Sequence, residues 1–177
     1  IIPAEGGDMR KLNTPISSKE LPNFSPDGQW VAYVGREGRG NWWKNDAVWV
    51  VPATGEGEAH NLTASYDFTV SAFTLNDMGD ATLMPPTWAK DGSALTFQIS
   101  RYGNTTLHTL SLEDGTLETL VGDDGVVGAY NFDTAQCKLA YFHGTMTDPH
   151  QIWLRDMPTG ETRQLTHINT DLLAQLD

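Results

Sequence analysis

One pattern recurs three times along the 177 residues, and it constrains the fold more than any other feature. Each copy begins with an aromatic residue, passes through a polar turn and ends with an aromatic residue nine positions later: Phe24 to Tyr33, Trp88 to Phe97 and Phe132 to Tyr141. Two copies carry Asp-Gly in the turn, at 27–28 and 91–92, whereas the third has Ala135-Gln136. Because Asp-Gly is typical of tight hairpins, each copy predicts two antiparallel strands joined by a short turn.

Two further elements follow each copy at similar positions. Short strands rich in β-branched and aromatic residues are predicted at 48–52, 107–111 and 152–156, and each runs into a glycine turn. A glycine five residues before a leucine then closes the unit, at Gly57 to Leu62, Gly115 to Leu120 and Gly160 to Leu165. The same closing element occurs at Gly7 to Leu12. The chain is therefore expected to begin on the last strand of a unit whose first part is missing.

The spacing of the copies indicates the architecture. Their starts at 24, 88 and 132 are 64 and then 44 residues apart. The shorter spacing falls in the range of about 40 to 50 residues that is typical of a four-stranded propeller blade. The longer one holds two insertions, at 36–46 and 65–84. The predicted fold class is all-β, a partial β-propeller of four-stranded antiparallel blades, with about three blades plus one strand.

The repeats also predict boundaries within the chain. Pro22 and Pro86 are each expected to mark the beginning of a blade's first strand, because proline cannot donate a hydrogen bond to a strand ladder. Helical periodicity is predicted only at the C-terminal segment that starts at Asn169. The predicted organisation is an outer strand of a truncated preceding blade at 1–13, a blade at 14–66 with the insertion 36–46, a blade at 67–122 with a long leading loop, a blade at 123–168, and a tail at 169–177 that leads to a missing final blade or catalytic domain.

The repeats carry a more specific resemblance. The segments FSPDG…VAYV, WAKDG…LTFQI, VWVVPATGEGEAHNLT and IWLRDMPTGETRQLTHIN resemble propeller repeats of the prolyl oligopeptidase family of serine peptidases, nearest to the acylaminoacyl-peptidase and dipeptidyl-peptidase-like branch. The same short repeat occurs in TolB-type propellers. Three phrases favour the peptidase branch: NLTASYD followed by a long insertion and PPTWAKDGSALTF; TDPHQIWLRD; and RQLTHINTDLL. The resemblance covers residues 1–168 by repeat and 169–177 by context.

The resemblance implies that this chain itself has a non-catalytic role. The family's catalytic serine lies in a G-x-S-x-G motif at a strand-to-helix turn, and the sequence contains no such motif. No catalytic residue and no cofactor is therefore assigned, and the parent protein is expected to hydrolyse peptides. The implied partners are an α/β-hydrolase domain of the same parent chain and a peptide substrate. The alternative is a TolB-like binding or scaffold propeller that has no catalytic partner.

Charge narrows the remaining partners. Eleven Lys and Arg stand against 23 Asp and Glu, which gives a formal net charge of −12. Such a surface repels phosphate backbones and anionic lipids, so nucleic acid and membrane surfaces are not expected partners. No run approaches the roughly 18 apolar residues of a membrane span. The edges of an incomplete set of blades also predict self-association.

The single cysteine, Cys137, excludes an intramolecular disulfide. It lies in the strand-like run CKLAYF, where a small buried apolar side chain is the favoured interpretation over a nucleophile. The chain opens with Ile1-Ile2-Pro3, without an initiator Met or a signal-peptide segment, so its start resembles a cut inside a longer protein. These features leave the compartment open and slightly favour the cytoplasm.

Other polar groups predict no metal site and no modification. The five histidines are scattered without tight ligand spacing, and the acidic turns at Asn76, Asp77 and Asp80 and at Asp123 and Asp124 lack the spacing of a calcium loop. Solvated side chains are the favoured interpretation. Glycosylation sequons occur at Asn23, Asn61 and Asn104, and chance explains them adequately.

The insertion 36–46 yields the sharpest hypothesis. It places Arg36 and Arg39 around Trp42 and Trp43, so cations and aromatic side chains gather in an otherwise acidic chain. In the resembled family the propeller caps the hydrolase domain and contributes loops to the substrate cavity. These four residues are therefore candidates for contact with a peptide or with the partner domain. The alternative is a loop that packs its own tryptophans on the edge of the blade.

Overall fold

The computed structural model describes residues 1–74, 83–122 and 124–175. By internal contacts the chain divides into two compact units. The first comprises Ile1–Val70, Pro85–Phe97 and Leu110–Leu117, and the second comprises Ser71–Met84, Gln98–Thr109 and Glu118–Asp177. In the described residues the structure is almost entirely β, with one short helix, so the predicted all-β fold class is confirmed.

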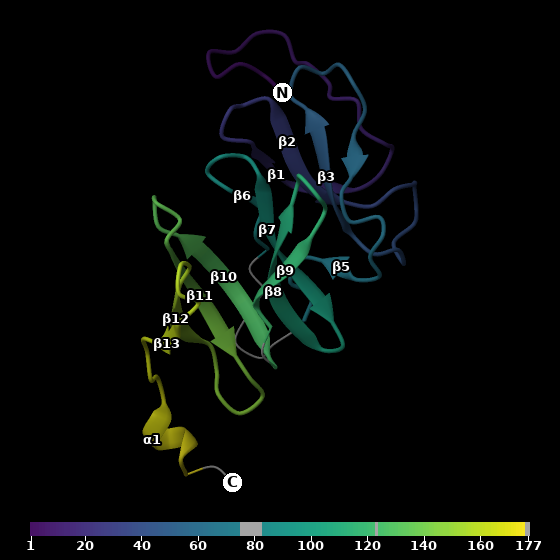
Figure 1. The fold of residues 1–177 in the computed structure, drawn as a ribbon. Coiled ribbons are helices and arrows are strands. Elements are labelled where there is room, and N and C mark those ends of the chain that lie inside the picture. The colour runs from purple at the N-terminus through teal and green to yellow at the C-terminus, as the bar shows by residue number, and fades with distance from the viewer. Residues whose placement is uncertain (75–82, 123, 176–177) are drawn as a thin grey trace. The chain divides into compact units, whose positions relative to one another are not determined.

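The first blade is a four-stranded antiparallel sheet in the first unit, and its strands follow one another in chain order (Figure 1). Each central strand is a run of apolar residues, as expected for strands that are covered on both faces. Its two outer strands differ in length, because the last one pairs over two residues only. The strands are β1 (Lys19–Phe24), β2 (Trp30–Gly35), β3 (Ala47–Pro52) and β4 (His60–Asn61).

The two faces of this sheet bury different groups. Tyr33 pairs with Trp49 and Val31 with Val51, so these four side chains share one face. They form a buried cluster, and Tyr33 stacks on Trp49 with ring centroids 6.2 Å apart. Val50 pairs with Ala32 and also with His60 of β4, which places these residues on the opposite face.

The second blade begins after the longer insertion. Pro86 directly precedes β6, in agreement with the prediction that it marks the start of a strand. The boundary between the two units falls within β7 and β8, which form one hairpin. The strands are β6 (Thr87–Trp88), β7 (Ala94–Arg101), β8 (Asn104–Ser111) and β9 (Leu117–Val121), and the two-residue strand β5 (Thr69–Val70) also pairs with β7.

The third blade lies in the second unit (green to yellow in Figure 1), and its own strands pair antiparallel, whereas its first strand also pairs in parallel with β8, with Val126 opposite Thr105. Its core is built from Leu139 and Tyr141 of the second strand, with Val127 and Tyr130 of the first. The side-chain amide of the buried Gln98 donates to the carbonyl oxygens of Val127, at 2.8 Å, and Gly128, at 2.9 Å. The elements are β10 (Val126–Phe132), β11 (Lys138–Gly144), β12 (Gln151–Asp156), β13 (Thr162–Gln164) and the helix α1 (Thr170–Leu173).

The repeated motif forms the same hairpin in every blade. The residue after the first aromatic bonds across the turn, from Ser25 N to Trp30 O at 2.9 Å, from Ala89 N to Ala94 O at 2.8 Å and from Asp133 N to Lys138 O at 3.0 Å. The fourth turn residue has a positive φ in all copies: 70° at Gly28, 76° at Gly92 and 56° at Gln136. The third turn therefore keeps its geometry without Asp-Gly.

Residues 1–18 contain no strand, although an outer strand was expected within 1–13. The segment closes on itself instead: Ile1 N donates to Arg10 O and Arg10 N donates to Ile1 O, both at 2.8 Å. Ile1 and Leu12 pack against the cluster around Tyr33. An outer strand must pair with a neighbouring strand through a ladder of backbone hydrogen bonds. The two hydrogen bonds between Ile1 and Arg10 do not form such a ladder.

Two local predictions were wrong. Pro22 does not precede the first strand but lies inside β1, at an irregularity in the pairing where Leu21 has a φ of 55°. Proline is tolerated there because a bulge leaves an N–H out of the ladder. Cys137 is exposed rather than buried, since it occupies the last turn position before β11, which corresponds to the exposed Gln29 of the first hairpin.

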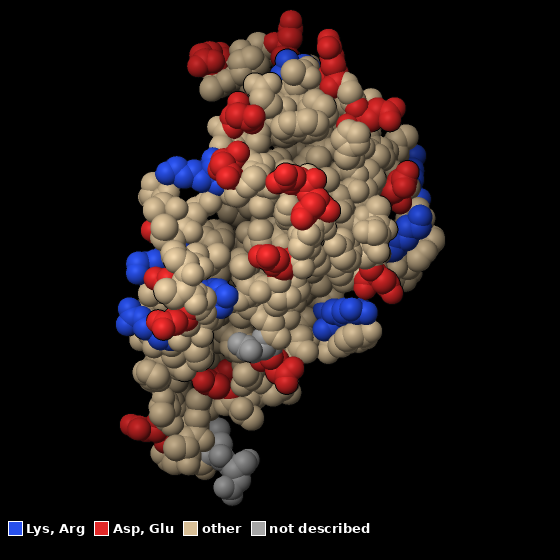
Figure 2. All heavy atoms as spheres, in the orientation of Figure 1, with Lys and Arg blue, Asp and Glu red and all other residues tan. Residues whose placement is uncertain are grey.

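Acidic side chains are spread over much of the face shown in Figure 2, as the net charge of −12 implies. No helix among the described residues is long and apolar enough to cross a membrane.

Candidate functional site

The insertion between β2 and β3 is held at its base by an ion pair. Arg36 Nε lies 2.8 Å from Asp46 Oδ1 and Arg36 Nη2 lies 2.7 Å from Asp46 Oδ2, so both ends of the guanidinium are engaged. The remaining nitrogen, Nη1, donates to the carbonyl oxygen of Trp42 at 2.7 Å. Such bidentate pairs fix geometry as well as charge. Arg36 thus ties the first and last residues of the loop to its centre.

The loop presents two tryptophans to solvent. Trp42 is 79% exposed and Trp43 66% exposed, and their rings meet edge to face with centroids 6.1 Å apart. The blade therefore covers little of either ring, in contrast to the alternative, in which the loop packs its own tryptophans on the edge of the blade. Arg39 is exposed and makes no hydrogen bond or ion pair to a described residue. Contact of these residues with a peptide or a partner domain stays a prediction.

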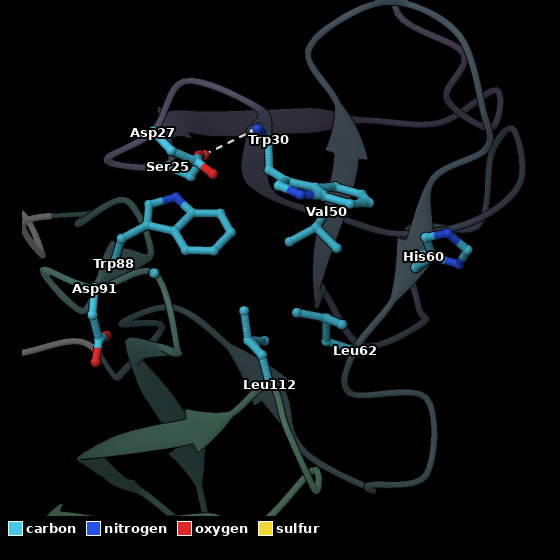
Figure 3. A pocket seen from close by; sticks show the side chains of 10 residues that line it. Ser25, Asp27, Trp30, Val50, His60, Leu62, Trp88, Asp91 and Leu112 are labelled. Carbon is cyan, nitrogen blue, oxygen red and sulfur yellow. Dashed lines mark hydrogen bonds between the residues drawn. The ribbon is translucent and has the colours of Figure 1, made fainter.

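A second feature lies at the other end of the same strands, because β2 runs from Trp30 toward the loop and β3 returns from it. It is a hollow of about 370 Å³ in the first unit, and we call it the hollow below. Its lining residues come from the β1–β2 hairpin, β3, the β4 region, the β6–β7 hairpin and the end of β8. They are Ser25, Asp27, Trp30, Val50, His60, Leu62, Trp88, Asp91, Gly92 and Leu112 (Figure 3).

The middle of the hollow is apolar. The side chains of Val50, Leu62 and Leu112 converge on its centre, and the indoles of Trp30 and Trp88 border the same space (Figure 3). Trp88 is buried and donates its indole N–H to the carbonyl oxygen of Asn23 at 3.2 Å, which fixes the plane of its ring.

The rim carries two carboxylates, each held within its hairpin. Asp27 Oδ1 accepts the Ser25 hydroxyl at 2.6 Å and the Gln29 N–H at 3.0 Å. Asp91 Oδ1 likewise accepts the hydroxyl and the N–H of Ser93, at 2.6 and 3.0 Å. These hydrogen bonds, the hydroxyl first and the N–H second, hold the pKa of both carboxyl groups below the ordinary value. Both side chains are therefore ionised at neutral pH.

The opposite side of the hollow is bordered by His60, which is exposed (Figure 3). Its ring lies 6.5 Å from that of Trp30, at an interplanar angle of 54°. The lining therefore has an acidic side, an apolar middle and an imidazole side, and it includes neither Lys nor Arg.

The remaining sequence candidates lie apart from both features. In residues 1–74, 83–122 and 124–175, no three His, Cys, Asp or Glu side chains are grouped so that they could hold a metal ion. Asn76, Asp77, Asp80 and Asp123 lie outside the described residues. The side chains of the sequon asparagines form hydrogen bonds with the backbone. Asn23 donates to the carbonyl oxygen of Pro86, whereas Asn61 and Asn104 accept hydrogen bonds from the N–H groups of Thr63 and Gly125.

The hollow was not predicted from the sequence. The aromatic residue and the aspartate of each repeat indicate a hairpin, and the turn hydrogen bonds agree with that interpretation. The same turns also bring Asp27 and Asp91 to one hollow. The available signal was the repetition itself, because two similar acidic turns in adjacent repeats of one fold carry their side chains to related positions.

The four-stranded antiparallel blades, each opened by the same aromatic hairpin, define a β-propeller fold. Among solved structures the chain is similar to a protein assigned as TolB from Agrobacterium tumefaciens, with 16% identity and a TM-score of 0.64 over 88% of this chain and 50% of that one. It is also similar to acylaminoacyl peptidase from Pyrococcus horikoshii, with 19% identity and a TM-score of 0.59 over 85% of this chain and 20% of that one.

A further similarity is to the β-propeller domain of the Trilobed protease from Pyrococcus furiosus, with 17% identity and a TM-score of 0.55 over 81% of this chain and 38% of that one. No protein-family model and no curated protein matches the chain. The chain thus spans half or less of each of these three structures. At such identities the likeness concerns the fold, and at that level the predicted resemblance to both kinds of propeller is confirmed.

Proposed function

We propose that the chain is a non-catalytic propeller segment of a serine peptidase of the prolyl oligopeptidase family, and that it gates and positions peptide substrate and docks the hydrolase domain. Two similarities support this proposal: the fold resembles that of an acylaminoacyl peptidase and that of the propeller domain of a protease. In both cases the chain corresponds to less than half of the matched chain. The proposed hydrolase partner would occupy the remainder of a longer protein.

The observation that carries the proposal is the geometry of the 36–46 loop. Exposed aromatic side chains bind partners well when they are held in place before binding, because little conformational entropy is then lost. The ion pair between Arg36 and Asp46 and the bond to the Trp42 carbonyl provide that restraint. Arg36 therefore positions the loop, whereas Trp42, Trp43 and Arg39 are the groups that remain free to contact a partner.

Alanine at both Trp42 and Trp43, introduced into the complete parent protein, tests this role. If the loop positions peptide, KM for peptide hydrolysis rises by about tenfold, which corresponds to the loss of one aromatic anchor. If the loop docks the hydrolase domain, the two domains unfold in separate thermal transitions instead of one. The control is Tyr102→Ala, which removes another exposed aromatic, 86% accessible, in the β7–β8 turn. Unchanged kinetics together with unchanged unfolding would refute both roles.

A TolB-like binding propeller without a catalytic partner is the second candidate. It is favoured by the structural match to the TolB protein, which has the highest TM-score of the three and covers half of that chain. The reading frame after Asp177 separates the two proposals. A G-x-S-x-G motif within a few hundred residues supports the peptidase, whereas a stop codon or further repeats supports the binding propeller.

We also propose self-association through open strand edges as a property of the isolated chain. Unpaired N–H and C=O groups at the edge of a sheet can pair with a second copy. Light scattering over a range of concentrations measures this directly. A well-folded monomer at the highest concentration would contradict it.

A further inference from the structure

We infer that the hollow in the first unit is a binding site for a basic side chain, arginine or lysine, presented by an extended peptide or protein segment. The inference does not rest on the peptidase proposal, since it concerns the chain's own surface. A peptidase propeller and a binding propeller could both use such a site.

The size of the hollow fits one or two residues of a peptide. Its volume of about 370 Å³ lies toward the lower end of the roughly 300 to 1,000 Å³ that is typical of ligand pockets. It therefore accommodates a long side chain and a short piece of backbone rather than a large cofactor.

The apolar middle fits the stem of such a side chain. Lysine and arginine carry three or four methylene groups before the charge, and these bury themselves against apolar surface while the charged group stays near water. Val50, Leu62 and Leu112 provide that surface. The indole of Trp30, which is half-buried, borders it and offers a ring against which a guanidinium can stack.

The rim supplies the opposite charge. In both rim carboxylates the two turn hydrogen bonds end on Oδ1, so Oδ2 of Asp27 and Oδ2 of Asp91 make no hydrogen bond to a described residue. The hairpins hold both carboxylates in place before any ligand arrives. A guanidinium or ammonium group is the complementary partner for such a carboxylate oxygen.

The charge of the lining selects against other ligands. An anion would face Asp27 and Asp91 without any Lys or Arg in the lining to balance them. A purely apolar ligand would fill the middle but gain no attraction from the two carboxylates. A basic side chain satisfies the apolar middle and the acidic side together.

The direct test is titration of the 177-residue chain with acetyl-Gly-Arg-Gly-amide, followed by NMR of the indole N–H groups. The chain has six tryptophans, and they report on different places. We expect saturable shifts at Trp30 and Trp88. We expect none at Trp49, which lies in the cluster around Tyr33, or at Trp153, which packs against the core of the third blade. The matched ligand replaces arginine by citrulline, which has nearly the same shape without the charge. It should bind about two- to fivefold more weakly, as expected for an exposed ion pair.

Substitutions in the rim test the role of the carboxylates. Asn can keep the Oδ1 acceptor of the turn and removes the charge, so Asp27→Asn and Asp91→Asn are expected to keep the fold and to weaken arginine binding about two- to fivefold each. The control is Asp156→Asn, which removes a similar turn carboxylate from the third blade, where Oδ1 accepts the N–H and hydroxyl of Thr159. It should leave the affinity unchanged.

Several results would overturn the inference. One is equal binding of the arginine and citrulline peptides, because it would mean that the hollow recognises shape alone. Another is an equal loss of affinity in Asp27→Asn, Asp91→Asn and Asp156→Asn, because it would indicate general attraction of a cation to an acidic chain. Shifts confined to Trp42 and Trp43, or no saturable shift, would place the site elsewhere or remove it. The wild-type titration decides this even if a variant fails to fold.

Discussion

The two ends of the first blade show opposite ways to build a surface. At the end where β2 leads into β3, a loop of consecutive residues projects two tryptophans into solvent and is held by one ion pair between Arg36 and Asp46. At the other end, residues far apart in sequence enclose a hollow, and its indoles are mostly covered. The loop can insert its tryptophans into a cavity of a partner, whereas the hollow can bind a side chain that a partner presents. Consecutive residues suffice for the first kind of surface, and the second kind requires the fold.

The largest expected effect comes from breaking the loop's ion pair. In Asp46→Ala the largely buried guanidinium of Arg36 loses its partner, and stability is expected to fall by about 2–4 kcal/mol, because an unpaired charge is left out of water. Urea unfolding measures the change. Glu37→Ala removes an acidic side chain from the same loop, but an exposed one, and should change stability by less than about 0.5 kcal/mol. Equal effects in the two variants would show that the loop is not anchored by this pair.

A second prediction concerns Tyr33, which lies on the buried face of the first blade between its two ends. Burial raises the pKa of Tyr33 to about 12, and its hydroxyl has no hydrogen-bond partner among the described residues. The unfolded chain ionises this tyrosine near its ordinary pKa of about 10, so between about pH 10 and pH 12 the folded state holds the proton more tightly. Stability is then lost as pH rises, by about 1–2 kcal/mol.

The variant Tyr33→Phe removes this loss while leaving stability at pH 7 unchanged within about 1 kcal/mol. Unfolding in urea at pH 8 and pH 11.5 measures the difference. Tyr102→Phe, at an exposed position, should follow the wild type at both values. The interpretation fails if Tyr33→Phe shows the same alkaline loss as wild type.

The hollow end of the blade is expected to respond to a backbone change. Gly28 has a φ of 70°, and a Cβ added there would meet no atom within 4 Å, so any cost arises from the backbone alone. Gly28→Ala should therefore destabilise the chain by about 1 kcal/mol. Gln29→Ala, at the next and exposed turn position, is the control. A Gly28→Ala protein as stable as this control would mean that the turn relaxes without strain.

The smallest expected effect comes from the opposite kind of substitution, the introduction of a glycine in the turn of the third blade. Gln136 adopts a φ of 56° at the position of Gly28, so Gln136→Gly should relieve that strain. We expect a gain of only about 0.5 kcal/mol, because glycine also gains freedom in the unfolded chain and the interactions of Gln136 are lost. The midpoint of urea unfolding is the measurement. A loss of stability would show that those interactions outweigh the strain.

Much of the fold was predictable because its signals are local. The runs VAYV and VWVV predict the two central strands, and Asp-Gly predicts the turn before the first of them. The errors arose where a residue's neighbours in space, not in sequence, decide its state. Pro22 is accommodated by a bulge in β1, and Cys137 is exposed because the turn ends one residue later than the strand-like run suggested.

The candidate surfaces were predictable to different degrees for the same reason. Trp42 and Trp43 stand out in sequence because they interrupt the repeat, whereas the ion pair that holds them was not predicted. The hollow combines residues from 25 to 112, and its apolar residues come from strands and from the turns that follow them, without a motif that marks a site. The predicted blade boundaries and the predicted contacts of the loop remain predictions.

The exposed pair Trp42–Trp43 also gives the chain an optical signature. Indoles in water emit at longer wavelengths than buried ones and are reached by soluble quenchers, and these two differ in this respect from the buried Trp49 and Trp88. Emission at long wavelength therefore reports mainly on the loop, and emission at short wavelength on the interior. Any partner that covers the loop would shift the spectrum toward the blue and protect it from quenching, without a label.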